Sequence, residues 1–406
     1  MVENDTYIDI FAGCGGLSLG LHNAGWKGLF AIEKSPQAFK TLDFNLTQKV
    51  NHFNWPSWLP KQAYDINVLI KKYENELKKL QGTVTLVVGG PPCQGFSIAG
   101  QRNEKDKRNK LINSYIKFIS LVRPELIFFE NVKGFTMEFK NNQLKGKKYS
   151  QIVTKKLTEI GYNVYGELLN FGDYGIPQKR TRFILVGIRN DIKDSSIEKA
   201  NSFFDFIEMQ KFSFLKEKKL SVNPTVEEAL SDLLDSDRST ETPDRKGFRS
   251  GTYEKAASGY QKYIRKNTQG IETPDSHSFP KHSKKITDRF KYIQSMNLEC
   301  KNISKELKEK LHINKQVLVP LQVGTQSPTV TSIPDDMIHY SEPRVLTVRE
   351  CARLQSFPDD FEFLGNYTTG GKMRKVEVPR YTQVGNAIPP LFGEQAGIAL
   401  KRLMYE

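Results

Sequence analysis

The chain has 406 residues, of which 38% are hydrophobic, and this is enough for one large domain or two ordinary ones. The formal net charge of +14 and the pI of about 9.3 favour a polyanionic partner, because lysine and arginine side chains that neutralise phosphates release bound counterions. No apolar run approaches the ~20 residues that cross a bilayer, which excludes a membrane-spanning helix.

The first predicted elements surround a glycine-rich turn. Residues 7–11 form a short apolar run that predicts a buried strand, a helical pattern follows at 17–24, and residues 28–32 predict a second strand. Between the first strand and the helix, the sequence YIDIFAGCGG at 7–16 has glycines that let the backbone turn sharply and approach a ligand closely. Glu33 ends the second strand, where a carboxylate can accept hydrogen bonds from ribose hydroxyls.

The turn and Glu33 together indicate a nucleoside-containing cofactor without saying which one. A nicotinamide dinucleotide is disfavoured, because Ser18 stands where the G-x-G-x-x-G pattern needs its third glycine. Asp65 is a third candidate, since its carboxylate can accept a hydrogen bond from an adenine amino group. The alternatives are a purely structural turn for the glycines and a helix N-cap for Asp65.

Residues 84–88 predict a third buried strand, and the sequence GGPPCQGFS follows at 89–97. Ligands of open α/β sheets bind beyond the carboxyl ends of the strands, so Cys93 is placed for chemistry. The two prolines stiffen the loop and argue against the alternative, a small buried hydrophobic cysteine. A nearby helix N-terminus or basic residue would favour the reactive thiolate.

A helical pattern at 111–122 ends before Pro124 and leads into a predicted strand at 126–129. The sequence ENV follows at 130–132, so Glu130 is expected at the carboxyl end of that strand. A carboxyl group in a cleft there can be partly desolvated and stay protonated near neutral pH. A capping glutamate is the alternative.

Residues 183–188 predict one more strand, and the sequence QKRTRF at 178–183 runs into it. Alternate residues of a strand point to the same side, so Arg180 and Arg182 are expected to share a direction. One of them is expected to reach the ligand cleft while other basic residues contact phosphates. A basic surface strand is the alternative.

Near-continuous apolar strands separated by helices are typical of a parallel sheet covered on both faces. We therefore predict an α/β fold with a doubly wound, mostly parallel sheet. The amino-acid composition changes at 191–343, which is polar and lysine-rich, and recognisable sequence motifs resume at Arg344. We predict a catalytic and cofactor-binding domain formed by 1–190 and 344–406, with a smaller domain inserted at 191–343. Within the insert, basic, aromatic and small polar residues are interleaved at 237–330.

The cysteines are Cys14, Cys93, Cys300 and Cys351. No two of them have the short spacing of a zinc knuckle or a redox dithiol, and so few in a chain of this length argue against a disulfide framework. The first residues have no charged-then-apolar signal layout. We therefore expect no metal site and a reducing, cytoplasmic location.

These segments together resemble the DNA (cytosine-5) methyltransferases of bacterial restriction-modification systems. The similarity covers 5–190 and 344–396, in the family's motif order. The segments that carry it are IDIFAGCGG at 8–16, Glu33, PPCQGFS at 91–97, ENV at 130–132, QKRTRF at 178–183, RVLTVRECARLQSFP at 344–358 and QVGNAIPP at 383–390. The resemblance implies the Rossmann-like fold of S-adenosylmethionine-dependent methyltransferases.

The resemblance implies transfer of a methyl group from S-adenosylmethionine to C5 of a cytosine within a specific duplex DNA sequence. Cys93 looks like the nucleophile that adds to C6 of the base. Glu130 looks like the residue that holds the base at N3 and at its amino group, and Arg182 looks like the contact to O2. The chemistry agrees, because C5 of cytosine is too weak a nucleophile unless a thiolate has first added at C6. The base has to be flipped out of the duplex for this reaction.

Further residues look like the cofactor site of that family. They are Phe11 with the backbone of Ala12, Gly13 and Gly15, then Glu33 for the ribose, Asp65 for the adenine, Pro91, and Asn386 as part of the wall. One departure is Lys34, because the family often has a bulky apolar residue after the ribose-binding acid. A second feature is the basic loop after Ser97, which fits a mobile catalytic loop.

The resemblance also implies the partners. The insert at 191–343 corresponds to the family's target-recognition domain, so the expected partner is double-stranded DNA. We expect a monomer in the cytoplasm, with the nucleoid, and a cognate restriction endonuclease that acts separately. Neither a membrane nor a metal is expected.

Three alternatives compete with this interpretation. An RNA (tRNA) cytosine-5 methyltransferase would share the core motifs, but that branch has a smaller insert and a Cys-Phe-Thr tripeptide that this sequence lacks. A non-catalytic DNA-binding protein on the same fold is disfavoured by the intact Cys93, Glu130 and Arg182. A nicotinamide-dependent dehydrogenase is disfavoured by the glycine spacing and leaves the PPC loop unexplained.

Overall fold

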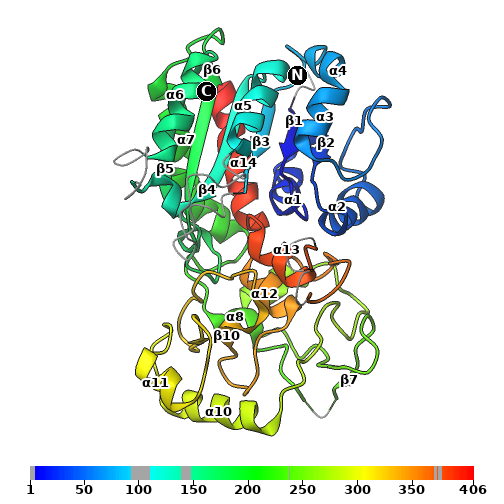
Figure 1. Cartoon of the computed structure of the whole chain (residues 1–406), viewed down its shortest axis with the longest axis vertical. Helices are drawn as coiled ribbons and strands as arrows, with labels where there is room; N and C mark the ends of the chain where they lie inside the picture. The colour runs from blue at the N-terminus through cyan, green and yellow to red at the C-terminus, as the bar shows by residue number, and fades with distance from the viewer. Residues whose placement is uncertain (1–4, 93–109, 139–147, 237, 370–372, 374–376) are drawn as a thin grey trace. The chain divides into compact units, whose positions relative to one another are not determined.

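The structure is a computed structural model that describes residues 5–92, 110–138, 148–236, 238–369, 373 and 377–406. Cys93 and the basic loop after Ser97 lie outside the described residues. Two compact units make up the chain (Figure 1). Unit 1 comprises Met1–Asn170, Thr181–Lys211 and Gly393–Glu406, and unit 2 comprises Phe171–Arg180 and Phe212–Phe392.

Unit 1 contains a six-stranded sheet with the strand order β2-β1-β3-β4-β6-β5. Its strands are β1 (Thr6–Ile10), β2 (Lys27–Ile32), β3 (Leu86–Gly89), β4 (Leu126–Val132), β5 (Tyr162–Asn170) and β6 (Thr181–Arg189). Strands β2, β1, β3 and β4 are parallel, and β6 is antiparallel to both β4 and β5. The predicted α/β fold with a mostly parallel sheet is therefore confirmed.

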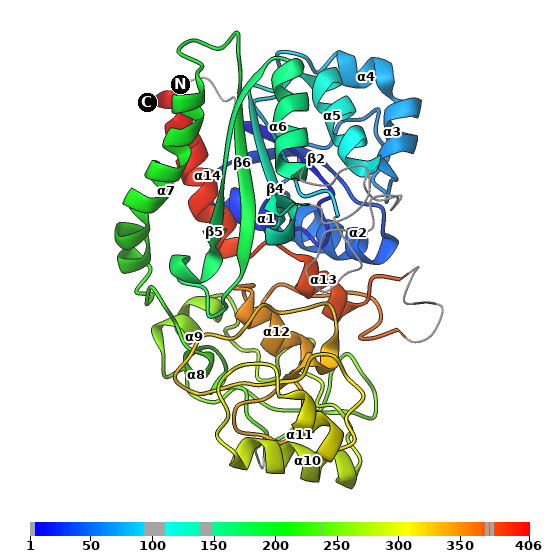
Figure 2. The same cartoon turned by 60° about the vertical axis from the view of Figure 1, so that its left-hand side comes forward.

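Helices cover both faces of this sheet (Figure 2). They are α1 (Gly16–Asn23), α2 (Pro36–Leu42), α3 (Ile66–Lys72), α4 (Glu74–Lys78), α5 (Lys110–Val122), α6 (Tyr149–Glu159), α7 (Ile197–Glu217) and α14 (Pro390–Tyr405). A π-helical turn at Asp43–Lys49 continues α2, and a 3-10 turn at Lys133–Thr136 follows β4.

Strand β4 shows why its residues form a buried central strand. Successive side chains of a strand point to opposite faces, so both faces need apolar groups when both are covered. Phe129 packs edge-on against Tyr115 of α5, with ring centroids 5.2 Å apart. Phe128 points the other way, toward Phe203 of α7, with ring centroids 6.0 Å apart. The continuous apolar run in the sequence therefore reflects two helical layers.

Helix α14, near the end of the sequence, returns to the N-terminal part of unit 1. The indole Nε1 of Trp26 donates to the carbonyl oxygen of Gly397 at 2.9 Å. The ammonium group of Lys401 lies 2.7 Å from Asp5 Oδ2. These contacts join residues almost 400 positions apart, so the last helix is an integral part of unit 1.

Unit 2 is built from short elements joined by long loops. Its helices are α8 (Val226–Leu230), α9 (Gly259–Ile264), α10 (Lys284–Ser295), α11 (Lys305–Lys310), α12 (Val348–Leu354) and α13 (Arg380–Asn386). Its strands pair as β7 (Thr240–Glu241) with β8 (Arg249–Ser250) and β9 (Val319–Pro320) with β10 (Met337–Ile338). Figure 2 shows α10 and α11 at one end of this unit and α13 at the other.

Buried ion pairs hold α12 inside unit 2. The Arg353 side chain is fully buried and donates to Asp359 Oδ2 at 2.7 Å, and it also pairs with Asp232. Arg344 makes two parallel hydrogen bonds to the Glu350 carboxylate, at 2.6 and 2.8 Å. Because the remaining guanidinium bonds go to backbone and carboxylate oxygens, these buried charges are compensated. The charged residues of the motif at 344–358 therefore stabilise the fold.

The bounds of unit 2 differ from those of the predicted insert. The α12 and α13 segment was expected in the catalytic domain, but it belongs to unit 2 together with α8 and α9. The reason is the buried contact of α12 with α8, in which Arg353 Nη1 donates to the Ala229 carbonyl oxygen at 2.8 Å.

None of the helices among the described residues is long and apolar enough to cross a membrane.

Candidate active site

The glycine-rich turn follows β1 directly and has a strained backbone. Phe11 has a φ of 62°, which is rare for a residue with a side chain, and Gly13 and Gly15 have φ values of 58° and 94°. The amide of Ala12 donates to the Ile32 carbonyl oxygen at 3.0 Å, which ties the turn to the end of β2. Gly15 is the N-cap of α1. The turn therefore leaves the half-buried Phe11, Ala12 and Gly13 at the carboxyl ends of two adjacent strands.

Glu33 links this turn to the segment after β2. Its Oε2 accepts a hydrogen bond from the Gly13 amide at 2.9 Å, and its Oε1 accepts one from the Ser35 amide at 2.7 Å. Burial raises the pKa of Glu33, and the amide hydrogen bonds oppose that rise. Each carboxylate oxygen has a second lone pair, so Glu33 can still accept hydroxyl donors while it is held in place.

Asp9 lies one layer behind the turn, and the sequence analysis gave it no role. Its side chain is buried in β1 and its Oδ2 accepts a hydrogen bond from Ser18 Oγ at 2.6 Å. Burial raises the pKa of Asp9 to about 7. The sequence signal that could have identified Asp9 is an acidic residue inside an otherwise apolar strand. The Asp9–Ser18 bond joins β1 to α1 and so fixes both ends of the glycine-rich turn.

Asp65 takes the role that the sequence analysis gave as its alternative. It is the N-cap of α3, with Oδ1 accepting the Asn67 amide at 2.9 Å. Its Oδ2 pairs with Lys34 Nζ at 2.9 Å. Burial would raise the pKa of Asp65, but the bonds from Lys34 and Asn67 outweigh it and the pKa is lowered. Lys34, the departure from the family pattern, is thus the ionic partner of the expected adenine-binding residue.

The loop that leads to Cys93 packs closely against Glu130. Gly90 follows the last residue of β3, and a Cβ atom there would lie 2.7 Å from Glu130 Oε2. The buried Asn131 donates from Nδ2 to the Pro91 carbonyl oxygen at 3.2 Å. A side chain at position 90 would therefore displace the Glu130 carboxylate, and Asn131, which had no predicted role, fixes the loop at Pro91. Cys93 itself lies outside the described residues.

Glu130 and Arg182 form an ion pair on one face of the sheet. Glu130 lies among the last three residues of β4, which extends to Val132 and is therefore longer than the predicted strand at 126–129. In the antiparallel β4–β6 pair, Arg182 is opposite Val132, which puts it diagonal to Glu130 on the same face. Arg182 Nε lies 2.9 Å from Glu130 Oε1, and both side chains are about seven-eighths buried, with 13% and 14% exposed.

Burial and the opposite charge act on the Arg182 guanidinium in opposite directions. Burial lowers the pKa of Arg182, and the adjacent Glu130 carboxylate opposes that shift. Each side chain therefore supplies the countercharge that the other needs in this buried position.

Arg180 and Arg182 do not share a direction, contrary to the sequence-based expectation. Arg180 precedes β6 and belongs to unit 2, where its buried guanidinium donates to the carbonyl oxygens of Val330 and Gly385 at 3.2 and 2.9 Å. Arg182 belongs to unit 1. The alternation rule failed because the strand begins only at Thr181.

The other cysteines lie in surroundings that disfavour a thiolate nucleophile. Cys14 and Cys351 are buried, and burial raises the pKa of both thiols, to about 12 for Cys14. Burial also raises the pKa of the half-buried Cys300. A raised pKa suppresses the thiolate, which is the reactive form. None of the cysteines in the described part of the chain is therefore suited to nucleophilic attack.

Residues 6–402 match the family of C-5 cytosine-specific DNA methylases. The chain belongs to the C-5 cytosine-specific DNA methylases. It is 29% identical to the type II methyltransferase M.DdeI of Desulfomicrobium norvegicum, over 95% of this chain and 86% of the relative. It is 30% identical to the type II methyltransferase M.BspRI of Lysinibacillus sphaericus, over 94% of this chain and 78% of the relative.

Solved structures agree with this DNA methylase fold. An E. coli prophage-encoded protein, assigned as a DNA modification methyltransferase, superimposes with a TM-score of 0.64 at 24% identity, over 99% of each chain. The Dnmt2 methyltransferase of S. pombe superimposes with a TM-score of 0.53 at 16% identity, over 98% of each chain. The sequence-based resemblance is therefore confirmed, and so is the methyltransferase fold.

Asn386 is the predicted cofactor residue in unit 2 of this methylase. It is the last residue of α13 and is exposed. Its place in the site wall remains a prediction, because the cradle residues of the glycine-rich turn belong to unit 1.

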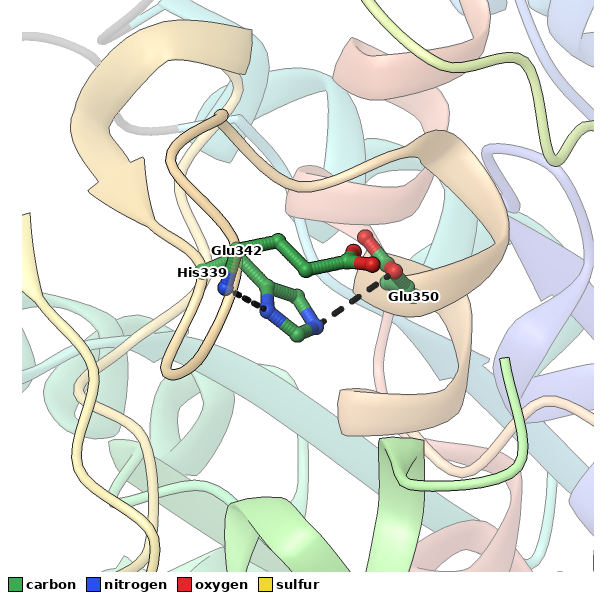
Figure 3. A group of neighbouring side chains, drawn as sticks. All are labelled: His339, Glu342 and Glu350. Carbon is green, nitrogen blue, oxygen red and sulfur yellow. Dashed lines mark hydrogen bonds and ion pairs between the residues drawn. The ribbon is translucent and has the colours of Figure 1, made fainter. Parts of the chain in front are cut away.

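One cluster in unit 2 of the DNA methylase has the residue types of a metal site. It consists of His339, Glu342 and Glu350, whose possible ligand atoms lie within 4.8 Å of one another (Figure 3). Arg344 bonds both carboxylates, with Nε 2.8 Å from Glu342 Oε2. Burial lowers the pKa of His339 to about 3, so the ring is neutral. An arginine of the chain itself, Arg344, thus pairs with both carboxylates.

Proposed function

We propose that this DNA cytosine-5 methyltransferase takes its methyl group from S-adenosylmethionine and attacks the target base with Cys93. The observation that carries the proposal is the Glu130–Arg182 pair, held against the Gly90–Pro91 turn that leads to Cys93. A nucleophile, an acid and a cationic hydrogen-bond donor at adjoining strand ends are the groups that covalent catalysis on a pyrimidine requires.

The glycine-rich turn fits a nucleoside cofactor. The positive φ values at Phe11, Gly13 and Gly15 bring the backbone around the end of β1, and Glu33 offers carboxylate lone pairs beside it. We propose that this turn holds S-adenosylmethionine together with Pro91, Asn386 and Asp65. When bound, that cofactor supplies an electrophilic methyl group on a sulfonium.

The paired side chains match the edge of cytosine. Cytosine presents an amino donor, the N3 acceptor and the O2 acceptor in a row. A carboxylate accepts from the amino group, and a guanidinium donates to O2, so Glu130 and Arg182 complement opposite ends of that edge. Thymine has an oxygen in place of the amino group and would be repelled by the Glu130 carboxylate. The pair can therefore select cytosine.

We propose that the chemical steps divide among these residues as follows. Cys93 adds as a thiolate to C6, which places electron density at C5. Glu130, protonated as the base enters, donates to N3 and stabilises the charge that the addition creates there. Arg182 donates a hydrogen bond to O2 of the base. C5 would take the methyl group that the bound cofactor supplies, and loss of the C5 proton to a base and elimination of the Cys93 thiolate then return the aromatic ring, now methylated at C5.

Bisulfite sequencing of DNA from cells that express the protein tests this function. The expected result is a set of protected cytosines that share one sequence context. Duplex DNA and tRNA offered in parallel to the purified protein separate the proposal from RNA methylation, because only the duplex should become methylated. Absence of protected cytosines in the DNA, with methylated tRNA, would overturn the proposal.

The cofactor proposal predicts the effect of removing the ribose-side carboxylate. Glu33→Ala should weaken the binding of S-adenosylmethionine by ~1.5–3 kcal/mol, the range for hydrogen bonds to a charged group. Binding to DNA should change much less. Titration calorimetry of the free protein with the cofactor measures the first quantity, and fluorescence anisotropy with duplex DNA measures the second.

Asp65 needs a matched pair of variants, because it also caps α3. Asp65→Asn keeps an N-cap acceptor for the Asn67 amide, whereas Asp65→Ala removes it at a cost of roughly 0.5–2 kcal/mol of stability. Both should weaken cofactor binding if the carboxylate holds the adenine. Unchanged calorimetric affinity in Glu33→Ala and in both Asp65 variants would refute the proposed cofactor site.

We propose that residues 191–343 set the DNA sequence that is methylated, without taking part in methyl transfer. The motif residues proposed for chemistry lie outside this segment, which carries basic and aromatic side chains. Replacing 237–330 by the corresponding region of a relative with another specificity should transfer the other specificity. An active chimera that still methylates the original sites would show that specificity lies elsewhere.

The partners and location of the enzyme are part of the same proposal. The net charge of +14 supports binding of double-stranded DNA as the polyanionic substrate. We propose that a monomer acts at the nucleoid and that a cognate restriction endonuclease acts separately. The type II names of the relatives support the second point.

A further inference from the structure

A short hairpin in unit 2 presents an exposed basic tip. Strands β7 and β8 pair Thr240 with Ser250 and Glu241 with Arg249. The amide of Phe248 donates to the Arg245 carbonyl oxygen at 3.2 Å, and Gly247 has a φ of 77°, which closes a tight turn. A Cβ atom at Gly247 would meet nothing within 4 Å. The described residues therefore leave the backbone uncovered at Gly247.

Cationic and aromatic side chains alternate in a ladder beside this turn. Arg380 lies 4.5 Å from the ring centre of Tyr367, and Arg245 lies 4.7 Å from the same ring. Arg245 also lies 3.7 Å from the ring centre of Phe248, and Lys281 lies 4.6 Å from it. Arg245 is thus the central cation, and it contacts two aromatic rings.

The inner end of the ladder is fixed by ionic contacts. Asp244, adjacent to Arg245, accepts hydrogen bonds from the Tyr367 hydroxyl at 2.8 and 2.9 Å and pairs with Arg380. Arg380 is buried and also donates to Ser276 Oγ at 2.9 Å. The outer end, at Lys281, is exposed. One side of the Arg245 stack is therefore anchored in the protein, and the other opens to solvent.

A guanidinium held over aromatic rings keeps its donors for hydrogen bonds. The donors of arginine lie in the guanidinium plane, so contacts with the rings of Phe248 and Tyr367 order the side chain without using those donors. Arg245 Nη1 also donates to Ser278 Oγ at 3.4 Å. This hydrogen bond is long, so it adds little to the ordering of the guanidinium. Because the side chain is already ordered, little conformational entropy is lost when the edge binds a ligand.

We infer that Arg245 reads a guanine in the major groove, with its guanidinium edge donating to O6 and N7, and that the exposed Lys246 and Lys281 bind phosphates. This inference rests on the proposed role of residues 191–343. Two N–H donors in one ordered plane match the O6 and N7 acceptors on the edge of guanine, which is the commonest specific contact between arginine and DNA. Phosphate contacts need no fixed plane, and flexible lysines at the tip suit them.

The inference predicts different effects for Arg245→Lys and for Lys246→Ala. Arg245→Lys keeps the positive charge but loses the planar pair of N–H donors. Discrimination between G·C and the other base pairs at one position should therefore fall by about 5- to 150-fold. Lys246→Ala should weaken binding to all sequences alike and reduce the salt dependence by about one counterion. The measurement is kcat/KM on the duplex defined by bisulfite sequencing and on its single-pair variants, at two salt concentrations.

A second variant covers the case in which Arg245→Lys does not fold. Phe248→Leu removes one aromatic face of the stack and should relax the choice at the same base pair by a smaller factor. Equal weakening on all sequences with a reduced salt slope in Arg245→Lys would make Arg245 a phosphate contact and overturn the inference. An unchanged site preference in both variants would overturn it as well. If the wild-type protein methylates none of the duplexes, that result would instead refute the proposed function.

Discussion

Replacing Cys93 by serine should reduce methyl transfer to below about one thousandth of the wild-type rate, as expected when a covalent nucleophile is lost. A serine hydroxyl is not ionised near neutral pH, so C6 of the base would receive no strong nucleophile and C5 would stay unreactive. Cys14, Cys300 and Cys351 cannot substitute, because burial raises the pKa of each thiol. Transfer of radiolabelled methyl groups to duplex DNA measures the loss.

The Cys93→Ser variant should retain its fold and its affinity for DNA and cofactor. Thermal melting and calorimetry provide that control. Cys300→Ser is the matched variant, since this half-buried cysteine has no role in the proposed chemistry, and it should methylate DNA at the wild-type rate. Near-normal turnover by Cys93→Ser would show that Cys93 is not the nucleophile.

Glu130→Gln should lower kcat by roughly 10²- to 10⁴-fold, the range for loss of a general acid. The amide has nearly the shape of the carboxyl group but cannot deliver a proton to N3. It also leaves Arg182 without its anion, 2.9 Å away in the wild-type protein. Single-turnover methylation of saturating DNA isolates this step from binding.

An exposed glutamate provides the control for Glu130→Gln. Glu74 forms an i,i+4 pair with Lys78 on the surface of α4, and Glu74→Gln should leave turnover unchanged. The melting temperature of Glu130→Gln separates a catalytic from a structural loss. A loss of less than tenfold in a folded Glu130→Gln protein would exclude Glu130 as the acid.

Strand positions were predictable where both faces of a strand are buried. The run predicted at 126–129 is the apolar part of β4, but the strand continues to Val132 because its antiparallel partner β6 extends the hydrogen-bonded ladder. The edge strand β5 was missed. Its sequence YNVYGELLN mixes polar residues and glycine, and most of its side chains are only half-buried.

The site was predictable where one residue type determines the local geometry. The glycines after β1 and the position of Glu33 are such cases, and the structure places them together. Arg180 was not predictable, because its partners Val330 and Gly385 are 150 and 205 residues away in the sequence. The pairing of Lys34 with Asp65 likewise depends on how two separate loops fold.

The charged residues of α12 show a further limit of the sequence. Arg349, Glu350 and Arg353 have the composition of a solvated helix, yet all three are fully buried. The two arginines bind acidic or backbone groups of distant segments, such as Asp232 and Asp275, and Glu350 pairs with Arg344. Family resemblance marked this segment as important, but only the contacts explain it as a buried ionic core.

Duplex DNA with 5-fluorocytosine at the target position tests the central claim, covalent catalysis by Cys93, most directly. Fluorine cannot leave C5 as a proton does, so the adduct formed by Cys93 should accumulate when S-adenosylmethionine is present. We expect a denaturation-resistant protein–DNA complex, mapped by peptide mass spectrometry to Cys93 and absent from the Cys93→Ser variant. An active enzyme that forms no such complex, or one whose adduct maps to another residue, would contradict the account.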